Sequence, residues 1–295
     1  MPIPMQTIGL FATVTVFVVM LAIGLMLGRE QFAAALQRRV VLAAVLFAVV
    51  VPVPALAVLA LKIFGIEGPV AVGIILMAIS PGAPIALRRA LDAGGDPAFA
   101  PALHLAIVML AVLTVPGTVL VLDWIFAKDF AVSPLHIGRQ VFFAQLLPLA
   151  LGAGLRAVHP ALAARLERPL ARVGNLLLLA LTILVLADMP AIIAAVGWTP
   201  TLAGVGITVI ALAVGVAFAW RDPAVRPVAA VASAMRNPGL AIVIATVNHA
   251  PPAVTSAVIG YALGLAVTMI AFLQWRKRRA PDREPHAMGQ TGSTS

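Results

Sequence analysis

The chain contains no cysteine among its 295 residues, and only 11% of its residues are charged. Without cysteine it can form neither disulfide bonds nor thiolate metal sites, and it has no cysteine nucleophile. Soluble domains are about 25% charged and about 45–50% apolar. This chain is 62% hydrophobic with a mean hydropathy of +1.08, which excludes an ordinary soluble domain. The composition predicts an all-α polytopic membrane protein.

Acidic residues are also scarce, and the hydropathy pattern places all of them in loops or at helix ends. They are Glu30, Glu67, Asp92, Asp96, Asp123, Asp129, Glu167, Asp188, Asp222, Asp282 and Glu284. No carboxylate is therefore expected in the middle of a span, where it could bind a cation or relay protons. Paired intramembrane aspartates, a His-Glu-x-x-His motif and a Gly-x-Ser-x-Gly elbow are all absent, which makes an intramembrane enzyme the weaker interpretation.

Apolar stretches long enough to cross a bilayer, about 20 residues each, are abundant. Nine are predicted, at 7–28, 40–62, 69–89, 98–122, 138–156, 172–193, 200–220, 226–248 and 252–275. The first stretch lacks a basic leader, so we read it as a retained helix rather than a cleaved signal. Residues 1–279 then form a single transmembrane unit, and the polar tail 280–295 is expected to be disordered.

The basic residues indicate membrane orientation rather than nucleic-acid binding, although the net charge is +9. They fall in short clusters between the apolar stretches. One side of the predicted membrane carries sixteen of them, and the other carries three, namely Lys62, Lys128 and Arg139. By the positive-inside rule the N-terminus lies outside and the C-terminus lies in the cytoplasm. This arrangement suits a bacterial inner (plasma) membrane protein.

Two of the predicted spans contain a helix break near their middle. The stretch 69–89 contains Pro81, Gly82 and Pro84, and the stretch 226–248 contains Pro238 and Gly239. Proline removes a backbone donor and glycine adds conformational freedom, so each stretch should form a broken helix. Broken helices in corresponding positions of two halves point to the binding site of a secondary transporter.

The spacing of the two breaks fits an inverted repeat. If the chain holds two five-helix repeats and the first lacks its opening helix, both breaks fall in the fourth helix of their repeat. A separation of five spans gives the two halves opposite orientation. The pairs Gly24/Gly28 and Gly260/Gly264 have helix-packing spacing and are read as ordinary close packing rather than a dimer interface.

Several short stretches resemble the bile acid:sodium symporter family. They are Met26-Leu27-Gly28, Val72-Gly73-Ile74-Ile75-Leu76, Pro81-Gly82 and Arg236-Asn237-Pro238-Gly239-Leu240-Ala241, within a similarity that runs from about Phe17 to Trp275. The resemblance implies a panel domain and a core domain in which the two broken helices cross. It also implies a secondary transporter that moves a small organic anion by alternating access.

The resemblance also shows where this chain departs from the family. Family members bind sodium through a serine and an asparagine at the first break, where this chain has Ala86 and Leu87. The sodium-binding glutamate before the second break corresponds to Ala232, and a hydroxyl position in the next helix corresponds to His104. Sodium prefers oxygen ligands, so both sodium sites are expected to be lost. No metal and no cofactor is expected.

Arg236 is the one permanent charge predicted near the centre of a span. A central arginine is costly in a membrane and usually faces a cavity. Two sodium ions and one glutamate would give the family's site a net charge of +1, and Arg236 without that glutamate gives the same. Our hypothesis is that its guanidinium replaces the charge of bound sodium and faces the substrate anion. The alternative is a structural donor to carbonyl groups of the break.

His104 and Asn237 complete the candidate site. A histidine can titrate near neutral pH, so His104 could couple transport to protons. The alternative is that it donates a hydrogen bond to a carbonyl group of the broken helix. Asn237 is expected to satisfy backbone groups freed by the break. Gln145 and Asn248 are read as interhelical hydrogen-bonding residues rather than ligand contacts. A channel and an auxin-carrier-like transporter remain alternative functions at this point.

Overall fold

The structure is a computed structural model and describes residues 5–28, 33, 37–125, 134–187 and 189–279. Within these ranges the regular elements are all helices: α1 (Met5–Met26), α3 (Arg39–Val50), α4 (Pro52–Ile63), α5 (Gly68–Ala78), α6 (Ala86–Asp92), α7 (Phe99–Ile125), α8 (Pro134–Val141), the π-helix η1 (Phe142–Leu146), α9 (Leu147–Val158), α10 (Pro160–Ala187), α11 (Met189–Val196), α12 (Thr199–Phe218), α13 (Arg226–Ala234), α14 (Pro238–Val247) and α15 (Pro252–Arg279). The predicted disordered tail, 280–295, lies outside the described residues, as do Arg29, Lys128 and Arg283, which entered the orientation argument.

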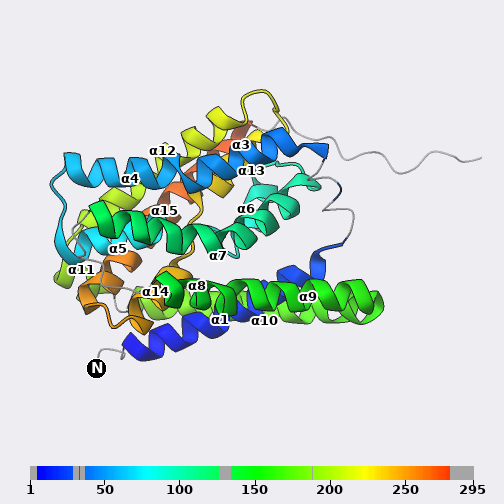
Figure 1. The fold of residues 1–295 in the computed structure, drawn as a ribbon, viewed down its shortest axis with the longest axis horizontal. Helices are drawn as coiled ribbons and strands as arrows, with labels where there is room; N and C mark the ends of the chain where they lie inside the picture. The colour runs from blue at the N-terminus through cyan, green and yellow to red at the C-terminus, as the bar shows by residue number, and fades with distance from the viewer. Residues whose placement is uncertain (1–4, 29–32, 34–36, 126–133, 188, 280–295) are drawn as a thin grey trace, which may run out of the picture.

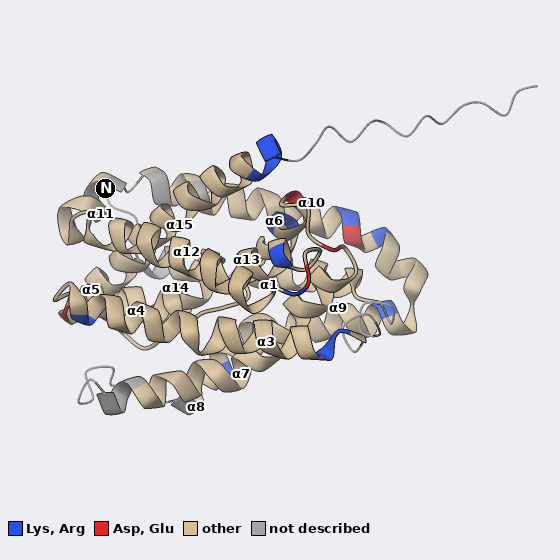
Figure 2. Cartoon of the chain, turned by 90° about the horizontal axis from the view of Figure 1, so that it is seen from above, with Lys and Arg blue, Asp and Glu red and all other residues tan. Residues whose placement is uncertain are grey.

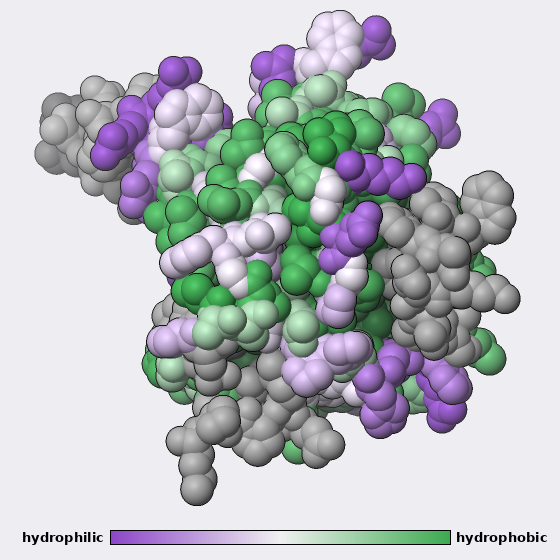
Figure 3. Space-filling view, turned by 90° about the vertical axis from the view of Figure 1, so that its left-hand side faces the viewer, coloured by the Kyte–Doolittle hydropathy of each residue, from purple (hydrophilic) through white to green (hydrophobic). Residues whose placement is uncertain are grey.

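Six helical stretches are long and apolar enough to cross a membrane. They are Gly9–Met26, Arg39–Ile63, Phe99–Val121, Leu135–Val158, Thr199–Phe218 and Pro252–Arg279. The all-α membrane fold predicted from the sequence is confirmed, whereas the count of nine spans and the repeat stay predictions. Large apolar side chains such as Leu113 and Ile63 are exposed, which is the pattern of a surface that meets lipid. Figure 3 shows hydrophobic side chains over much of one face.

The helices form two layers (Figure 1). The smaller layer contains α1, α8, η1, α9 and α10, and the larger layer contains the remaining helices. The layers meet where α1 packs against α14 and where α7 packs against α8 and η1. Figure 2 shows most of the charged residues toward the end of the molecule where α6, α9 and α10 lie. The described middle of the bundle is almost free of charge.

Glycines allow the closest helix contacts inside each layer. A Cβ atom on Gly24 would lie 2.2 Å from the carbonyl oxygen of Leu149, so α1 and α9 pack backbone to backbone. A Cβ atom on Gly264 would lie 2.2 Å from the carbonyl oxygen of Thr201, which joins α15 to α12 in the same way. Both glycines therefore serve packing within the chain.

The segment before the sixth predicted span differs from the prediction. We expected a basic loop up to residue 172, but α10 begins at Pro160 and carries Arg165 and Glu167 within it. Glu167 therefore lies inside a helix, which corrects the expectation that every acidic residue lies in a loop or at a helix end. The segment is rich in alanine, leucine and arginine, whose high helix propensity outweighs the cost of Pro169 inside the helix. The side chain of Glu167 pairs with Arg156 at 3.8 Å.

Candidate functional site

Both predicted breaks are present. The first separates α5, which ends at Ala78, from α6, which begins at Ala86, and it contains Gly82 with φ +78°. An L side chain is disfavoured at that φ, which explains why glycine occupies the position. The second break separates α13 from α14 and is short, since only residues 235–237 are non-helical. Asn237 caps α14, because its Oδ1 accepts a hydrogen bond from the Leu240 amide at 3.1 Å.

The two breaks pair with each other. Pro81 and Arg236 form an isolated antiparallel bridge, and the Asn237 amide donates to the Ser80 carbonyl oxygen at 2.8 Å. Side chains at these positions are buried. Backbone groups that lose their helical partners are costly in an apolar interior. Each break thus supplies hydrogen-bond partners to the other, and the two broken helices meet at these residues.

Arg236 lies at the meeting point and is 1% exposed. Its Nη1 and Nη2 donate to the carbonyl oxygen of Val49 at 3.2 and 3.1 Å, and Nη2 also donates to the carbonyl oxygen of Ser233 at 2.9 Å. Val49 lies near the end of α3, so the guanidinium ties the second break to the interruption between α3 and α4. Its Nε has no hydrogen-bond partner within the described part of the chain. None of the ion pairs found there includes Arg236.

A crevice adjoins the first break, and we call it the Gly82 crevice. Its empty volume is about 280 Å³, and it is lined by Gly82, Ala86, Leu87, Ala90, Ala100, Leu103, His104, Ile107, Val228 and Ala232. The structure therefore brings together Ala86, Leu87, His104 and Ala232, the four positions aligned with the family's sodium sites. None of the lining side chains carries an oxygen atom. These residues do not fit a sodium ion, which prefers oxygen ligands.

His104 is the polar side chain of the Gly82 crevice. It is 4% exposed, and its Nε2 has no hydrogen-bond partner in the described chain. The expectation that this nitrogen bonds a carbonyl group of the broken helix is therefore not supported by a contact. A buried polar atom without a partner is rare in native structures and needs an explanation such as a ligand or a water molecule.

A second crevice lies beside Pro81, and we call it the Pro81 crevice. Its empty volume is about 180 Å³, and it is lined by Val49, Val50, Pro54, Ile79, Pro81, Thr114, Thr118 and Arg236. Helix α7 forms a wall of both crevices, with His104 in one and Thr114 in the other. Ten residues of helix separate these two positions, a rise of about 15 Å. The crevices therefore occupy successive levels along α7, with the paired breaks between them.

Gln145 is a polar residue near the first break whose role the sequence did not reveal. It is fully buried on the π-helix η1, and neither Nε2 nor Oε1 has a hydrogen-bond partner within the described residues. A Cβ atom on Gly82 would lie 3.4 Å from this Oε1. The interhelical hydrogen bond that we expected for Gln145 is absent. Neither hydropathy nor spacing could have indicated this, because the contact depends on how η1 packs against α7.

The remaining predicted site residues frame the crossing. Pro238 begins α14, and Gly239 lies against α1, where an added Cβ atom would be 2.6 Å from Cγ2 of Val16. Pro84 lies in the first break, just before α6. Asn237 is 1% exposed, and its Nδ2 has no partner in the described chain. Several buried polar atoms close to the two breaks therefore have no hydrogen-bond partner among the described residues. They belong to His104, Gln145, Ser233, Arg236 and Asn237.

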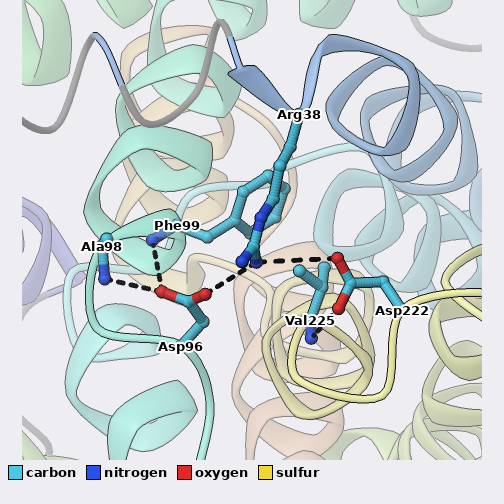
Figure 4. A network of polar contacts seen from close by, with 6 residues as sticks. All are labelled: Arg38, Asp96, Ala98, Phe99, Asp222 and Val225. Carbon is cyan, nitrogen blue, oxygen red and sulfur yellow. Dashed lines mark hydrogen bonds and ion pairs between the residues drawn. The ribbon is translucent and has the colours of Figure 1, made fainter.

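A charged network links the loop that follows α6 to the loop that precedes α13 (Figure 4). Nη1 of Arg38 pairs with Asp96 at 2.7 Å and with Asp222 at 3.6 Å. Asp96 follows α6, and Asp222 precedes α13. The Asp96 amide also donates to the carbonyl oxygen of Ala224 at 3.2 Å. One arginine before α3 therefore links the loops of both broken helices.

The pKa of Asp96 is lowered from its ordinary value of 3.8. Burial alone would raise this pKa, but the hydrogen bonds from the Phe99 and Ala98 amides and the charge of Arg38 outweigh it. The two amide bonds measure 3.0 and 2.8 Å and end on Oδ1. Asp96 therefore acts as an anchor in its charged form, because both its oxygens are occupied by donors.

The sequence was compared with known protein families and with individual curated proteins. A family model described as the Sodium Bile acid symporter family matches residues 13–196. The matched stretch runs from α1 to the end of α11, so it includes the first break, His104 and Gln145. The second break, with Arg236, lies after it. No curated protein matches the chain at a significant level.

Proposed function

The chain belongs to the sodium bile acid symporter family, and on this premise we propose that it carries a small organic anion across the membrane by alternating access, without sodium. The family is a family of membrane transporters and not of enzymes. The observation that carries the proposal is the pairing of the two breaks at Ser80, Pro81, Arg236 and Asn237. Non-helical backbone at membrane depth persists only where it is buried in protein or lines a cavity.

The residues of the Gly82 crevice support the proposed absence of sodium coupling. The four positions that would supply sodium ligands carry Ala86, Leu87, His104 and Ala232, and they lie together in one crevice. Hydrocarbon side chains offer no oxygen, and no carboxylate is present there to balance a bound cation. The positive charge at the crossing then comes from Arg236. A permanent buried cation of this kind favours a negatively charged substrate.

Arg236 serves two purposes in this proposal. Three hydrogen bonds to the carbonyl groups of Val49 and Ser233 give it a structural role. Carbonyl oxygens do not neutralise its charge, so the guanidinium still contributes a full positive charge to the Pro81 crevice. Measurement of anion binding by Arg236 variants distinguishes a purely structural role of this side chain from a role in substrate binding.

The substrate is proposed to be small. The space open to a water-sized sphere is about 10 Å³ in the Gly82 crevice and about 0 Å³ in the Pro81 crevice, so this conformation is closed around the crossing. A short carboxylate requires less opening of the crevices than a sterol conjugate does. The lining is mostly apolar with a few polar groups, which suits an anion that has a short hydrocarbon body.

Membrane orientation and movement complete the proposal. The N-terminus is placed outside and the C-terminus in the cytoplasm of a bacterial inner membrane, as the basic residues predict. The Arg38 network links the loop after α6 to the loop before α13, so the two broken helices are proposed to move as one body. Alternating access would then be a displacement of the larger layer against the smaller layer. Coupling to protons through His104 is the accompanying hypothesis.

The test is a thermal-shift screen of the purified protein against small organic anions, followed by uptake of each stabilising anion into proteoliposomes. Saturable uptake at carrier rates supports the proposal. A channel is the alternative, and ionic conductance far above carrier turnover would favour it. If no organic anion stabilises the protein or enters the vesicles, the proposed substrate class is wrong.

A further inference from the structure

The outer face of α10 changes from basic to apolar along the helix. Arg168 and Arg172 are exposed on it, and Leu176, Leu179 and Ile183 follow with exposed fractions of 65, 56 and 58%. Successive members of this set are three or four residues apart, and α10 is continuous across them, so all five side chains lie along one face. A face of this composition fits the boundary between lipid headgroups and acyl chains.

The arginines of this face have no acidic partner within the described residues. Glu167 is the one acidic residue of α9 and α10, and it pairs with Arg156 of α9 at 3.8 Å. Its side chain is therefore directed toward α9 and away from the outer face. None of the ion pairs found in the described part of the chain includes Arg168 or Arg172. The outer face of α10 thus carries two positive charges that the neighbouring helices do not balance.

The contact between α10 and α1 places this face relative to the membrane. An added Cβ atom on Gly174 would lie 2.8 Å from Cγ2 of Val19, which is well inside the apolar stretch Gly9–Met26 of α1. α10 begins at the end of the bundle where α1 ends, and Arg172 precedes Gly174 by two residues (Figure 1). At a rise of about 1.5 Å per residue, Arg172 lies about 7 Å inside the end of that stretch. An exposed arginine at this depth extends toward the headgroups, where its charge requires a counter-ion.

We propose that Arg168 and Arg172 bind the phosphate group of phosphatidylglycerol, an anionic phospholipid, and that its acyl chains lie along Leu176, Leu179 and Ile183. The planar guanidinium of arginine suits a phosphate, because it donates two parallel hydrogen bonds to the phosphate oxygens. Basic residues beside a membrane-spanning helix attract anionic headgroups. This site lies on the smaller layer and is separate from the crossing of the broken helices.

Charge complementarity favours an anionic lipid over the other possible occupants of this face. A zwitterionic lipid adds a cationic amine, and the described outer face of α10 has no carboxylate to receive it. A second copy of the chain, related by a two-fold axis along the membrane normal, would bring its own Arg168 and Arg172 to the same depth. Like charges would then repel each other across the contact.

The experiment measures lipid binding by the full-length protein in detergent. Phosphatidylglycerol and phosphatidylcholine with identical acyl chains are added separately, Tm is recorded, and native mass spectrometry counts the bound lipids. We expect phosphatidylglycerol to raise Tm more than phosphatidylcholine does. In the double variant Arg168→Gln/Arg172→Gln the Kd for phosphatidylglycerol should rise about tenfold, because charge-assisted hydrogen bonds are lost. Its Tm without lipid should stay close to that of the unmodified protein, since both side chains are exposed.

The matched control is the double variant Lys277→Gln/Arg278→Gln, which removes two exposed positive charges at the end of α15. It should keep the preference for phosphatidylglycerol, because the preference depends on the outer face of α10 and not on net charge. Glycerol phosphate, which has the phosphate but no acyl chains, should not raise the Tm of the unmodified protein at lipid concentrations.

Three results would overturn the proposal. The first is an equal Tm shift from the two lipids. The second is a lipid preference that both double variants keep or both lose. The third is a dimer of the unmodified protein that Arg168→Gln/Arg172→Gln dissociates, which would assign this face to a second copy of the chain. Stabilisation by glycerol phosphate equal to that by phosphatidylglycerol would likewise replace the lipid with a soluble phosphate.

Discussion

The Asn237 amide donates a hydrogen bond to the Ser80 carbonyl oxygen over 2.8 Å, and this contact joins the two breaks of the chain. Both residues are buried, so neither group could turn to water if the other were displaced. The pairing explains why two interruptions coexist at membrane depth. A break that stood alone would leave its own donors and acceptors unsatisfied.

Arg236→Ala should lower Tm strongly and abolish stabilisation by organic anions. The substitution leaves the carbonyl oxygens of Val49 and Ser233 without their donor, at a cost of about 1–3 kcal/mol for each buried group. Arg236→Lys should lose part of the structural contacts but keep the charge, since an ammonium cannot span both carbonyls as a planar guanidinium does. Thermal unfolding with and without anion measures both effects.

An exposed arginine provides the control for that measurement. Arg165→Ala on α10 should change neither Tm nor anion binding by more than a small amount. If Arg236→Ala retains full anion stabilisation after correction for its lower Tm, the guanidinium is structural only and the charge hypothesis is wrong.

Gly82→Ala should destabilise the protein and weaken substrate binding. Gly82 has φ +78°, where an L residue costs about 1–2 kcal/mol, and its new Cβ would lie 3.1 Å from Cγ2 of Val108. Gly94→Ala is the matched control, because Gly94 has φ +79° but its new Cβ would only approach Nη2 of Arg276 at 3.5 Å. Both variants should lose stability, and only Gly82→Ala should lose binding or uptake. Equal binding by the two variants would contradict a site at Gly82.

Exchange of potassium chloride for sodium chloride at equal ionic strength should leave Tm and anion affinity unchanged. Ala232→Glu should lower Tm, because the carboxylate would be buried in a crevice without a cationic side chain. Sodium should not rescue this variant, since Ala86 and Leu87 offer no oxygen ligands. A sodium-specific rise in Tm of the unmodified protein would show that the chain binds sodium through other residues.

Asp96 should contribute stability that disappears in acid. Its pKa is lower in the folded protein than the ordinary 3.8 of the unfolded chain, so the unfolded state binds the proton first as pH falls. The contribution is complete well above pH 3.8 and is lost as pH falls through the folded pKa. Tm measured across this range should fall less steeply for Asp96→Asn than for the unmodified protein.

Asp92→Asn is the comparison for Asp96. Asp92 pairs with Arg89 at 3.2 Å, but both side chains are more than one third exposed. Exposed pairs contribute little to stability, so this variant should have a Tm close to that of the unmodified protein. If Asp96→Asn and Asp92→Asn behave alike, the Arg38 network does not hold the broken helices.

An inward proton gradient should stimulate uptake by the unmodified protein in proteoliposomes, and His104→Gln should lose this stimulation. The reason is that His104 is the titratable side chain lining the Gly82 crevice. Uptake is measured with and without the imposed gradient for both proteins. Equal stimulation of both would end the proton-coupling hypothesis and leave His104 its role in ligand binding.

Local chemistry let the sequence predict much of the fold. Spans follow from hydropathy, because hydrocarbon requires about 20 apolar residues, and both breaks follow from Pro81, Gly82 and Pro238. The family resemblance, which the match to residues 13–196 confirms, came from the same short motifs. The prediction of a loop before residue 172 was wrong, since Pro160 begins a helix that intrinsic propensity favours over the charge pattern.

By itself, then, the sequence determined a polytopic helical transporter with two interrupted helices, an arginine at one of them and no sodium ligands at the expected positions. Only the tertiary structure decided what these residues touch. In the structure the Val49 carbonyl oxygen accepts hydrogen bonds from Arg236, and Arg38 pairs with both Asp96 and Asp222. Gln145 lies beside Gly82. The physical reason is that hydropathy and backbone chemistry act within a few neighbouring residues. Side-chain partners depend instead on how each helix is rotated and on which helices pack against it.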